Sequence, residues 1–371
     1  MQLSPVTRAN LELTETMRGR EKKGTLLWAL DKTETAMGKR LLRTWLEQPL
    51  VDPAAINQRL DAVECLVRDT VTRADIQDSL SRVFDMERLM TRAVYGSAAP
   101  REVYSLACTC QELPALKKLL EALPAPLLQT MQTEMDDLSD IRDLIFAAVS
   151  EDCPATLKDG GVIKTGYNHE VDELRDIMHG GKGVLSELES RLREETGISK
   201  LKIGFNRVFG YYIEVSKSYT GQVPEGFIRK QTLTTGERYI TQELKELENK
   251  ILGAGERLNA LEHELFADLL QKISAQIVRV QTTAKAVAEL DVLTSLAQTA
   301  VENNYVKPTV DDGDAITITE GRHPVVEQML KGTLFVPNDT LLDCGENRML
   351  IITGPNMAGK STYMRQNAII T

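Results

Sequence analysis

The chain reads TQELKELENKILGAGERLNALEHELFADLLQKISAQIVRVQTTAKAVAELDVLTSLAQTA from Thr241 to Ala300. Apolar residues recur here at intervals of three and four, from Leu244 to Val287. That spacing places them on one face of an α-helix. We expect one helix continuing to about Ala300, and at 1.5 Å per residue its length is roughly 90 Å. Because a compact domain is smaller than this, the helix is expected to belong to a lever that stands out from a helical bundle.

A second helical pattern precedes it, from about Val171 to Glu195. Gly180, Gly181 and Gly183 weaken its middle by about 1 kcal/mol each, which predicts a bend or break there. The two helical patterns are separated by a strand-like segment. We therefore favour an antiparallel pair of helices joined at its tip over the alternative, a coiled-coil dimer.

The tip, residues 197–240, has a different character. Its sequence KIGFNRVFGYYIEV, from Lys202 to Val215, is aromatic, β-branched and bounded by glycines, which predicts strands. We expect its aromatic rings to form a small core; they are Phe205, Phe209, Tyr211 and Tyr212.

The same segment is locally basic. Residues 196–240 carry seven lysines and arginines against three glutamates, a net +4, whereas the whole chain carries −10. The whole chain is thus not attracted indiscriminately to nucleic acid. A basic β module could instead grip the phosphates of duplex DNA without reading bases, although a solvated surface is the simpler alternative. The candidate DNA contacts are Lys200, Lys202, Asn206, Arg207, Lys217, Arg229, Lys230, Thr232 and Arg238.

The region before the lever predicts a bundle of medium helices. Leucine-rich patterns between residues 25 and 150 are interrupted by proline and glycine. Asp52 can cap a helix that begins at Pro53, where the missing N–H is harmless, and that ends at about Arg68. Aromatic residues make up only 5% of the chain, a composition that favours helices over a strand sandwich.

Composition also bounds the setting of the protein. Its five cysteines form no CxxC pair, so we expect reduced thiols and neither a disulfide framework nor a zinc site. The N-terminus lacks a basic segment leading into an apolar one, and no run of about 18 apolar residues occurs. We expect a cytoplasmic protein with no membrane partner.

A phosphate-binding motif lies near the C-terminus. GPNMAGKST, from Gly354 to Thr362, fits G-x-x-x-x-G-K-[ST]. MLIIT at residues 349–353 predicts a buried strand, and Ser361 to Ile370 can form a helix, so the motif has its expected strand-loop-helix setting. Glycines let backbone amides close around phosphate oxygens. We expect Lys360 to meet the β- and γ-phosphates of ATP, and the Ser361 hydroxyl to ligate Mg²⁺.

The nucleotide-binding residues predicted from this loop are Gly354, Pro355, Asn356, Met357, Ala358, Gly359, Lys360, Ser361 and Thr362. Hydrolysis also needs an acidic residue on a later strand and a group that orients water. The chain ends at Thr371, so we expect this chain not to hydrolyse ATP.

Several segments resemble the MutS family of DNA mismatch-repair ATPases. TGPNMAGKST, from Thr353 to Thr362, resembles that family's ATPase loop. Further segments agree in the same order: LLWALDKTETAMGKRLLRTWLEQPL from Leu26, FGYYIEVSKSY from Phe209, RKQTLTTGERYIT from Arg229, ENNYVKP from Glu302, EGRHPVVE from Glu320 and FVPND from Phe335.

The resemblance implies a mostly α fold: a multi-helix core with long lever helices, a small inserted β clamp module, and the N-terminal part of an α/β P-loop ATPase domain of the ABC type. The expected parts are residues 1–183 for the first part of the core and lever, 184–243 for the clamp with its β-rich tip at 197–240, 244–307 for the returning lever helix, and 308–371 for the ATPase part.

The resemblance also implies partners and roles. It implies duplex DNA as ligand, a homodimer in the parent protein and a MutL-type repair partner. In the parent, ATP binding is expected to move the clamp through the lever helices. Phe335 matches a residue placed to pack on adenine. For His323 we expect a structural hydrogen bond.

The sequence departs from the family pattern at both ends. None of its seven phenylalanines is followed two residues later by glutamate, the Phe-x-Glu by which the family probes mispairs. We therefore expect an internal piece that lacks the mismatch-reading and connector domains. A MutS paralogue acting on recombination intermediates and a non-enzymatic DNA-holding module are alternatives. A coiled-coil ATPase of the SMC or RecN kind is disfavoured, because its P-loop precedes the coiled coil.

Overall fold

The computed structural model describes residues 1–206, 210–330 and 332–371, and most of them are helical, as predicted. The chain divides into two compact units. Unit 1 comprises Met1–Thr91, Cys108–Arg142 and Gln276–Thr371. Unit 2 comprises Arg92–Ala107 and Asp143–Ala275. The boundary between the units falls within α6, α7 and α9.

The N-terminal helices are α1 (Pro5–Asn10), α2 (Leu26–Leu30), α3 (Ala36–Glu47), α4 (Pro53–Arg68), α5 (Thr70–Ser81), α6 (Met86–Val94), α7 (Pro100–Glu121), α8 (Pro126–Glu134) and α9 (Ser139–Ala148). The predicted helix Pro53–Arg68 is confirmed as α4. Asp52 caps it, because its Oδ1 accepts a hydrogen bond from the Ala54 N–H at 3.1 Å. Proline at the first position thus begins the helix where the missing donor costs nothing.

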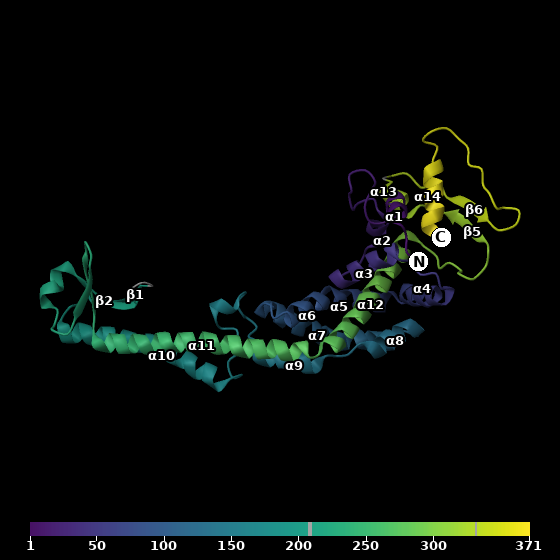
Figure 1. Cartoon of the computed structure of the whole chain (residues 1–371). Coiled ribbons are helices and arrows are strands. Elements are labelled where there is room, and N and C mark those ends of the chain that lie inside the picture. The colour runs from purple at the N-terminus through teal and green to yellow at the C-terminus, as the bar shows by residue number, and fades with distance from the viewer. Residues whose placement is uncertain (207–209, 331) are drawn as a thin grey trace. The chain divides into compact units, whose positions relative to one another are not determined.

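Helix α12 (Ile277–Asn303) forms the core of unit 1. It packs against α2, α3, α4, α5 and α8, and Figure 1 shows it among these N-terminal helices. The apolar side chains in its central part are buried on every side, among them Val287, Leu290 and Leu293, whereas Val278 and Val301 near its ends are exposed. A helix that is apolar all round is typical of a buried position, whereas a surface helix has one apolar stripe.

A ladder of buried polar side chains interrupts this apolar surface. Asp291 accepts hydrogen bonds from Glu34 N at 3.0 Å, Thr35 N at 2.8 Å and Thr35 Oγ1 at 2.6 Å. One turn later Ser295 accepts a bond from Lys32 N at 2.7 Å. Burial raises the pKa of the Asp291 carboxyl, although these hydrogen bonds oppose the shift. The contacts fix the turn between α2 and α3 onto α12.

Glycine at position 38 is required by this ladder. A Cβ added at Gly38 would lie 2.1 Å from Asp291 Oδ2, far inside van der Waals contact. The carboxylate therefore reaches the backbone of α3 only because residue 38 has no side chain.

The C-terminal part of unit 1 contains a two-stranded sheet and two helices. Strands β5 (Ile316–Gly321) and β6 (Asn338–Leu342) pair antiparallel, with an irregularity between Ile318 and Gly321. The short helix α13 (Pro324–Met329) follows β5, and α14 (Lys360–Ile370) follows the phosphate loop. The predicted helix after the loop is thus confirmed.

Unit 2 is built on two long helices, α10 (His169–Thr196) and α11 (Gln242–Ser274), which lie side by side in Figure 1. The predicted alternative of a break at the three glycines of α10 is wrong, since the helix is continuous, whereas a bend there stays a prediction. A Cβ added at Gly180 or Gly183 would meet no atom within 4 Å. The cost of glycine, about 1 kcal/mol each, is small beside the packing that holds a long helix against a partner.

A buried carboxylate joins these two helices to the loop before α10. Glu262 of α11 is 1% exposed and accepts hydrogen bonds from Gly161 N at 2.8 Å and Ile163 N at 3.4 Å. Arg175 of α10 donates to Glu262 Oε1 at 2.6 Å and to the Ile163 carbonyl at 2.6 Å. Glu262 and Arg175 therefore form an ion pair in which most of the hydrogen-bonding atoms have a partner.

The prediction of one helix from Thr241 to Ala300 is wrong. Helix α11 ends at Ser274 and α12 begins at Ile277, and Gln276 between them has φ −98° and ψ 15°. The interruption coincides with the boundary between the two units. The apolar spacing continues across it, so no local signal marks it. Tertiary packing instead determines where the helix is interrupted, because α11 buries one face whereas α12 is surrounded by other helices.

The predicted strands of the tip are confirmed. Strands β1 (Lys202–Asn206), β2 (Gly210–Ser216), β3 (Ile228–Thr232) and β4 (Gly236–Ile240) form an antiparallel sheet in the order β1-β2-β4-β3. Ile213, Val215 and Tyr239 are buried in one core with Leu188 of α10 and Leu244 of α11. One face of the sheet therefore covers the ends of the two long helices.

The expected aromatic core is only partly correct. Tyr211 is half-buried against this core, but Phe205 is 50% exposed and contacts Tyr211 with ring centroids 4.9 Å apart. Tyr212 lies on the opposite face, and Phe209 is outside the described residues. Aliphatic residues make up most of the core because the period-2 alternation of β2 places its neighbouring tyrosines on opposite faces. Among the described residues, no helix is both long and apolar enough to cross a membrane.

Candidate functional site

The phosphate loop lies between two glycines with positive φ. Gly354 has φ 149° and Gly359 has φ 84°, and the exposed Met357 between them has φ 67°. Gly359 is the N-cap of α14, and its position supplies no side-chain hydrogen bond to the first amides of the helix. A bound phosphate could accept from those amides, which also carry the partial positive charge of the helix N-terminus.

Lys360 is directed at the loop. Its ammonium donates to the carbonyls of Gly354 and Pro355, each at 2.6 Å. The side chain thus folds across the residues that a phosphate would contact. Ser361 is exposed in the first turn of α14, where its hydroxyl is free to approach a metal ion. These residues fit a magnesium nucleotide: a cation and helix amides would hold the phosphates, and Ser361 and the phosphates would hold Mg²⁺.

The rest of the predicted nucleotide set surrounds this arrangement. Pro355, Asn356 and Ala358 are exposed in the loop, and Thr362 is half-buried in α14. Phe335 is half-buried in the segment before β6. The structure therefore groups the predicted loop residues at the start of α14.

The strand predicted before the loop is absent, so this prediction is wrong. Residues 349–353 adopt no regular structure, and Met349 and Ile351 are 79% and 84% exposed. A buried parallel strand needs neighbouring strands and helices on both faces. Residues 349–353 pair with neither β5 nor β6, which form a sheet of two strands. Apolar composition alone therefore does not make this segment a strand.

The outer face of the four-stranded sheet carries several of the predicted DNA contacts. Arg238 is held there by three neighbours: its Nε donates to Glu214 at 3.2 Å, its Nη1 donates to Gln231 at 3.0 Å, and its guanidinium lies 4.0 Å from the centre of the Tyr212 ring. Gly204 makes room for that ring, since an added Cβ would lie 2.8 Å from it. The stacked tyrosine was not predicted from the sequence, although strand alternation places positions 212 and 214 on one face.

The remaining predicted contacts fall into two groups. Arg229 pairs with Glu237 at 3.3 Å, and Tyr239 donates to the same carboxylate at 2.5 Å. This hydrogen bond lowers the pKa of Glu237, and burial raises that of Tyr239 to about 12. The other group is exposed and takes part in no ion pair within the described part of the chain: Lys200, Lys202, Lys217 and Lys230.

Two uncharged residues were also predicted to contact DNA. Thr232 is exposed on β3 and Asn206 is half-buried at the end of β1. Arg207 lies outside the described residues. Among the predicted DNA contacts that the structure describes, the four lysines are thus the cations most available to an anionic ligand.

His323 has the structural role that was predicted. It is 2% exposed and accepts a hydrogen bond from Val326 N at 3.4 Å, which caps α13. Burial lowers the pKa of His323. A neutral imidazole is the form that can accept this hydrogen bond.

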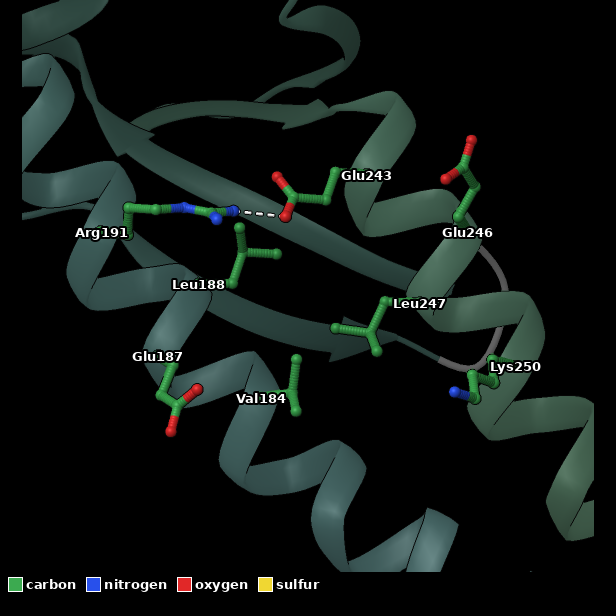
Figure 2. Close-up of a pocket in the computed structure, with 8 residues that line it drawn as sticks. All are labelled: Val184, Glu187, Leu188, Arg191, Glu243, Glu246, Leu247 and Lys250. Atoms are coloured by element: carbon green, nitrogen blue, oxygen red, sulfur yellow. Dashed lines mark hydrogen bonds and ion pairs between the residues drawn. The ribbon is translucent and has the colours of Figure 1, made fainter.

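A groove of about 500 Å³ lies between α10 and α11. Figure 2 shows its apolar floor, Val184, Leu188 and Leu247, and the ion pair between Arg191 and Glu243. Glu187, Glu246 and Lys250 complete the rim. Because acidic groups outnumber basic ones and Arg191 is already paired, the groove does not suit phosphates.

Comparison with known proteins gives matches along most of the chain. A family model for MutS domain III matches residues 6–297, and one for MutS domain V matches residues 350–371. A protein named DNA mismatch repair protein MutS from Ruminiclostridium cellulolyticum is 53% identical over 370 residues, all of this chain and 42% of the relative. Proteins of the same name from Acetivibrio thermocellus and Alkaliphilus oremlandii are each 51% identical over the same shares.

The chain thus spans about 42% of the length of these relatives. The domain III match alone covers more than half of the chain, and it contains the helical core, the long helix pair and the four-stranded sheet. The domain V match contains the phosphate loop and α14. This chain belongs to the MutS family of DNA mismatch repair proteins.

Proposed function

We propose that this chain holds duplex DNA through its four-stranded sheet, binds ATP with Mg²⁺ at the phosphate loop, and couples the two events in mismatch repair. The observation that carries the DNA-binding part is a set of exposed cations on the sheet and beside it that form no ion pair with any described residue: Lys200, Lys202, Lys217 and Lys230. In an acidic chain of net charge −10, such a local cluster provides contacts to phosphates without a general attraction to nucleic acid.

The readout of bases is not part of this proposal. Lysine is a flexible point charge that neutralises phosphates, whereas base edges are read by planar bidentate side chains. Within the described part of the sheet, Arg238 and Arg229 could act in this way, and they are paired with Glu214 and Glu237, respectively. We therefore assign the sheet to gripping the DNA backbone by charge and shape.

The nucleotide part of the proposal is supported by Lys360, Ser361 and the uncapped start of α14. Chain continuity supports the coupling, since α11 follows the sheet and leads through α12 to the segment that carries the loop. ATP hydrolysis, a homodimer and a MutL-type repair partner are proposed for the full-length protein from the resemblance of the quoted motifs. The relatives' printed names favour mismatch repair over a role at recombination intermediates.

Neutralising the sheet lysines is expected to weaken duplex binding and to reduce its salt dependence. Each Lys→Gln change at positions 200, 202, 217 and 230 that removes a phosphate contact should lower the slope of log K against log salt by about 0.9. The measurement is fluorescence anisotropy with a labelled duplex, repeated between about 50 and 200 mM salt.

Lys272→Gln is the matched control, because Lys272 lies on α11 and is paired with Asp268 at 2.8 Å. Its slope should equal that of the unchanged protein. If all four sheet variants keep the original slope, the sheet does not hold DNA phosphates.

A further inference from the structure

One face of α14 is bound to the β5–β6 sheet. Tyr363, Gln366 and Asn367 are spaced at i, i+3 and i+4, so they share a face of the helix. The helix begins at Lys360 of the phosphate loop. Whatever fixes this face therefore also fixes the loop relative to the two strands.

Thr340 of β6 is the centre of the contact. Its hydroxyl is 2.7 Å from the Tyr363 hydroxyl and donates to Asn367 Oδ1 at 3.0 Å. The Tyr363 hydroxyl is also 3.2 Å from the carbonyl of Asp339, and because it has one proton it donates either to this carbonyl or to Thr340. Thr340 is only 4% exposed, so its own contacts are partly shielded from water and their loss would leave a buried hydroxyl without partners.

Gln366 makes the second contact of the same face. It is fully buried, and a Cβ added at Gly321 of β5 would lie 2.8 Å from its Nε2. Glycine at this position thus lets α14 approach the sheet closely. The side chain of Asp339 secures the two strands on their other side, because its Oδ1 accepts from Glu320 N at 2.7 Å.

The anchored strand leads directly to an aromatic ring. Phe335 precedes β6 by three residues, and from residue 308 onward the chain's aromatic rings of the phenylalanine, tyrosine and tryptophan type are Phe335 and Tyr363 alone. Tyr363 is engaged by Thr340 and Asp339. The resemblance matches Phe335 to a residue placed to pack on adenine, and its flat ring suits the apolar face of a purine.

We propose that Thr340, Tyr363 and Asn367 are positioning residues that set the spacing between the phosphate loop and Phe335, so that a purine nucleoside triphosphate is held at both ends. The loop alone binds the phosphates. The Thr340 contact positions the Phe335 segment, so that the Phe335 ring can bind the base. This inference rests on the proposed nucleotide site. It goes further by naming the contacts, those of Thr340 with Tyr363 and Asn367, that make the site selective for a nucleotide over a bare polyphosphate.

The test compares two ligands in the full-length protein: ATP with Mg²⁺, and inorganic triphosphate with Mg²⁺. Tyr363→Phe removes the hydroxyl that bonds to Thr340 or to the Asp339 carbonyl, and should weaken ATP binding by about 10-fold. Binding of inorganic triphosphate, which needs only the loop, should change by less than about 2-fold. Thr340→Val should repeat the pattern, and Thr340→Ser, which keeps the hydroxyl, should restore ATP binding. Isothermal titration calorimetry measures both ligands, and thermal unfolding checks that each variant is folded.

A double-mutant cycle with Phe335→Ala identifies the route of the effect. If Tyr363 acts by placing the Phe335 ring, Tyr363→Phe should have little further effect on ATP binding once that ring is removed. Equal losses for ATP and inorganic triphosphate, or unchanged ATP binding in Tyr363→Phe and Thr340→Val, would overturn the positioning role alone. An unsubstituted protein that binds neither ligand would instead overturn the nucleotide site itself.

Discussion

Replacing Lys360 by alanine is expected to lower the affinity for ATP by at least about 100-fold. The ammonium group lies 2.6 Å from the carbonyls of Gly354 and Pro355, so it is held over the loop before a ligand arrives. Charged hydrogen bonds contribute about 1.5–3 kcal/mol each, and two phosphates would share this donor, so its removal should cost roughly 3 kcal/mol or more. A loss of 1.4 kcal/mol corresponds to a factor of ten in the dissociation constant.

Titration calorimetry of the full-length protein with ATP and Mg²⁺ measures this change. Arg348→Ala is the matched control, because Arg348 is a cation of the same region whose Nε is bonded to the Cys344 carbonyl. It should bind ATP as the unchanged protein does. An unaltered dissociation constant for ATP in Lys360→Ala would contradict the assignment of the phosphate loop as the ATP-binding site.

Glu262→Ala is expected to destabilise the protein by about 3–5 kcal/mol, the usual cost of breaking a buried ion pair from one side. Arg175 would keep its charge in a largely buried position with only the Ile163 carbonyl and weaker contacts. The amides of Gly161 and Ile163 would lose their acceptor as well. The loop before α10 would then no longer be fixed to the helix pair.

Chemical denaturation followed by circular dichroism gives the free energy of unfolding for this comparison. Glu264→Ala serves as the control, since Glu264 is exposed on the same helix two residues away and should change the stability by less than about 0.5 kcal/mol. A similar, small effect of both substitutions would show that the ion pair does not hold the loop.

Local chemistry made some elements predictable from the sequence. Asp52 and Pro53 mark the start of α4, and the four strands of the tip follow from β-branched and aromatic residues between glycines. The start of α14 follows from the glycine and lysine of the loop motif. In each case the residues that specify the element are neighbours in the sequence.

Other features depend on residues far apart in the chain. The interruption between Ser274 and Ile277 has no glycine or proline to mark it, because it reflects the change from a one-sided to a surrounded helix. Asp291 contacts residues more than 250 positions away, and Gly38 gives no hint of the carboxylate that needs its missing side chain. The Thr340 contacts with α14 also join segments that no short motif connects.

The candidate site divides in the same way. The loop residues Gly354 to Thr362 were predicted, since the motif itself contains the chemistry. Of the predicted cations, the sequence could not separate Lys230, which is exposed, from Arg238, which is bound by Glu214, Gln231 and Tyr212. That distinction depends on which strand neighbours which, and the order β1-β2-β4-β3 is a property of the folded sheet.

The grip of the sheet on duplex DNA is tested most directly by replacing residues 200–238 with a short flexible linker in the full-length protein. The replaced segment contains β1 to β3 and most of β4, together with Lys200, Lys202, Lys217 and Lys230. We predict that salt-dependent binding of a duplex is lost, while ATP binding at the phosphate loop is retained as evidence of a folded protein. Duplex binding that keeps its affinity and salt dependence after the replacement would contradict the assignment of this sheet as the DNA clamp.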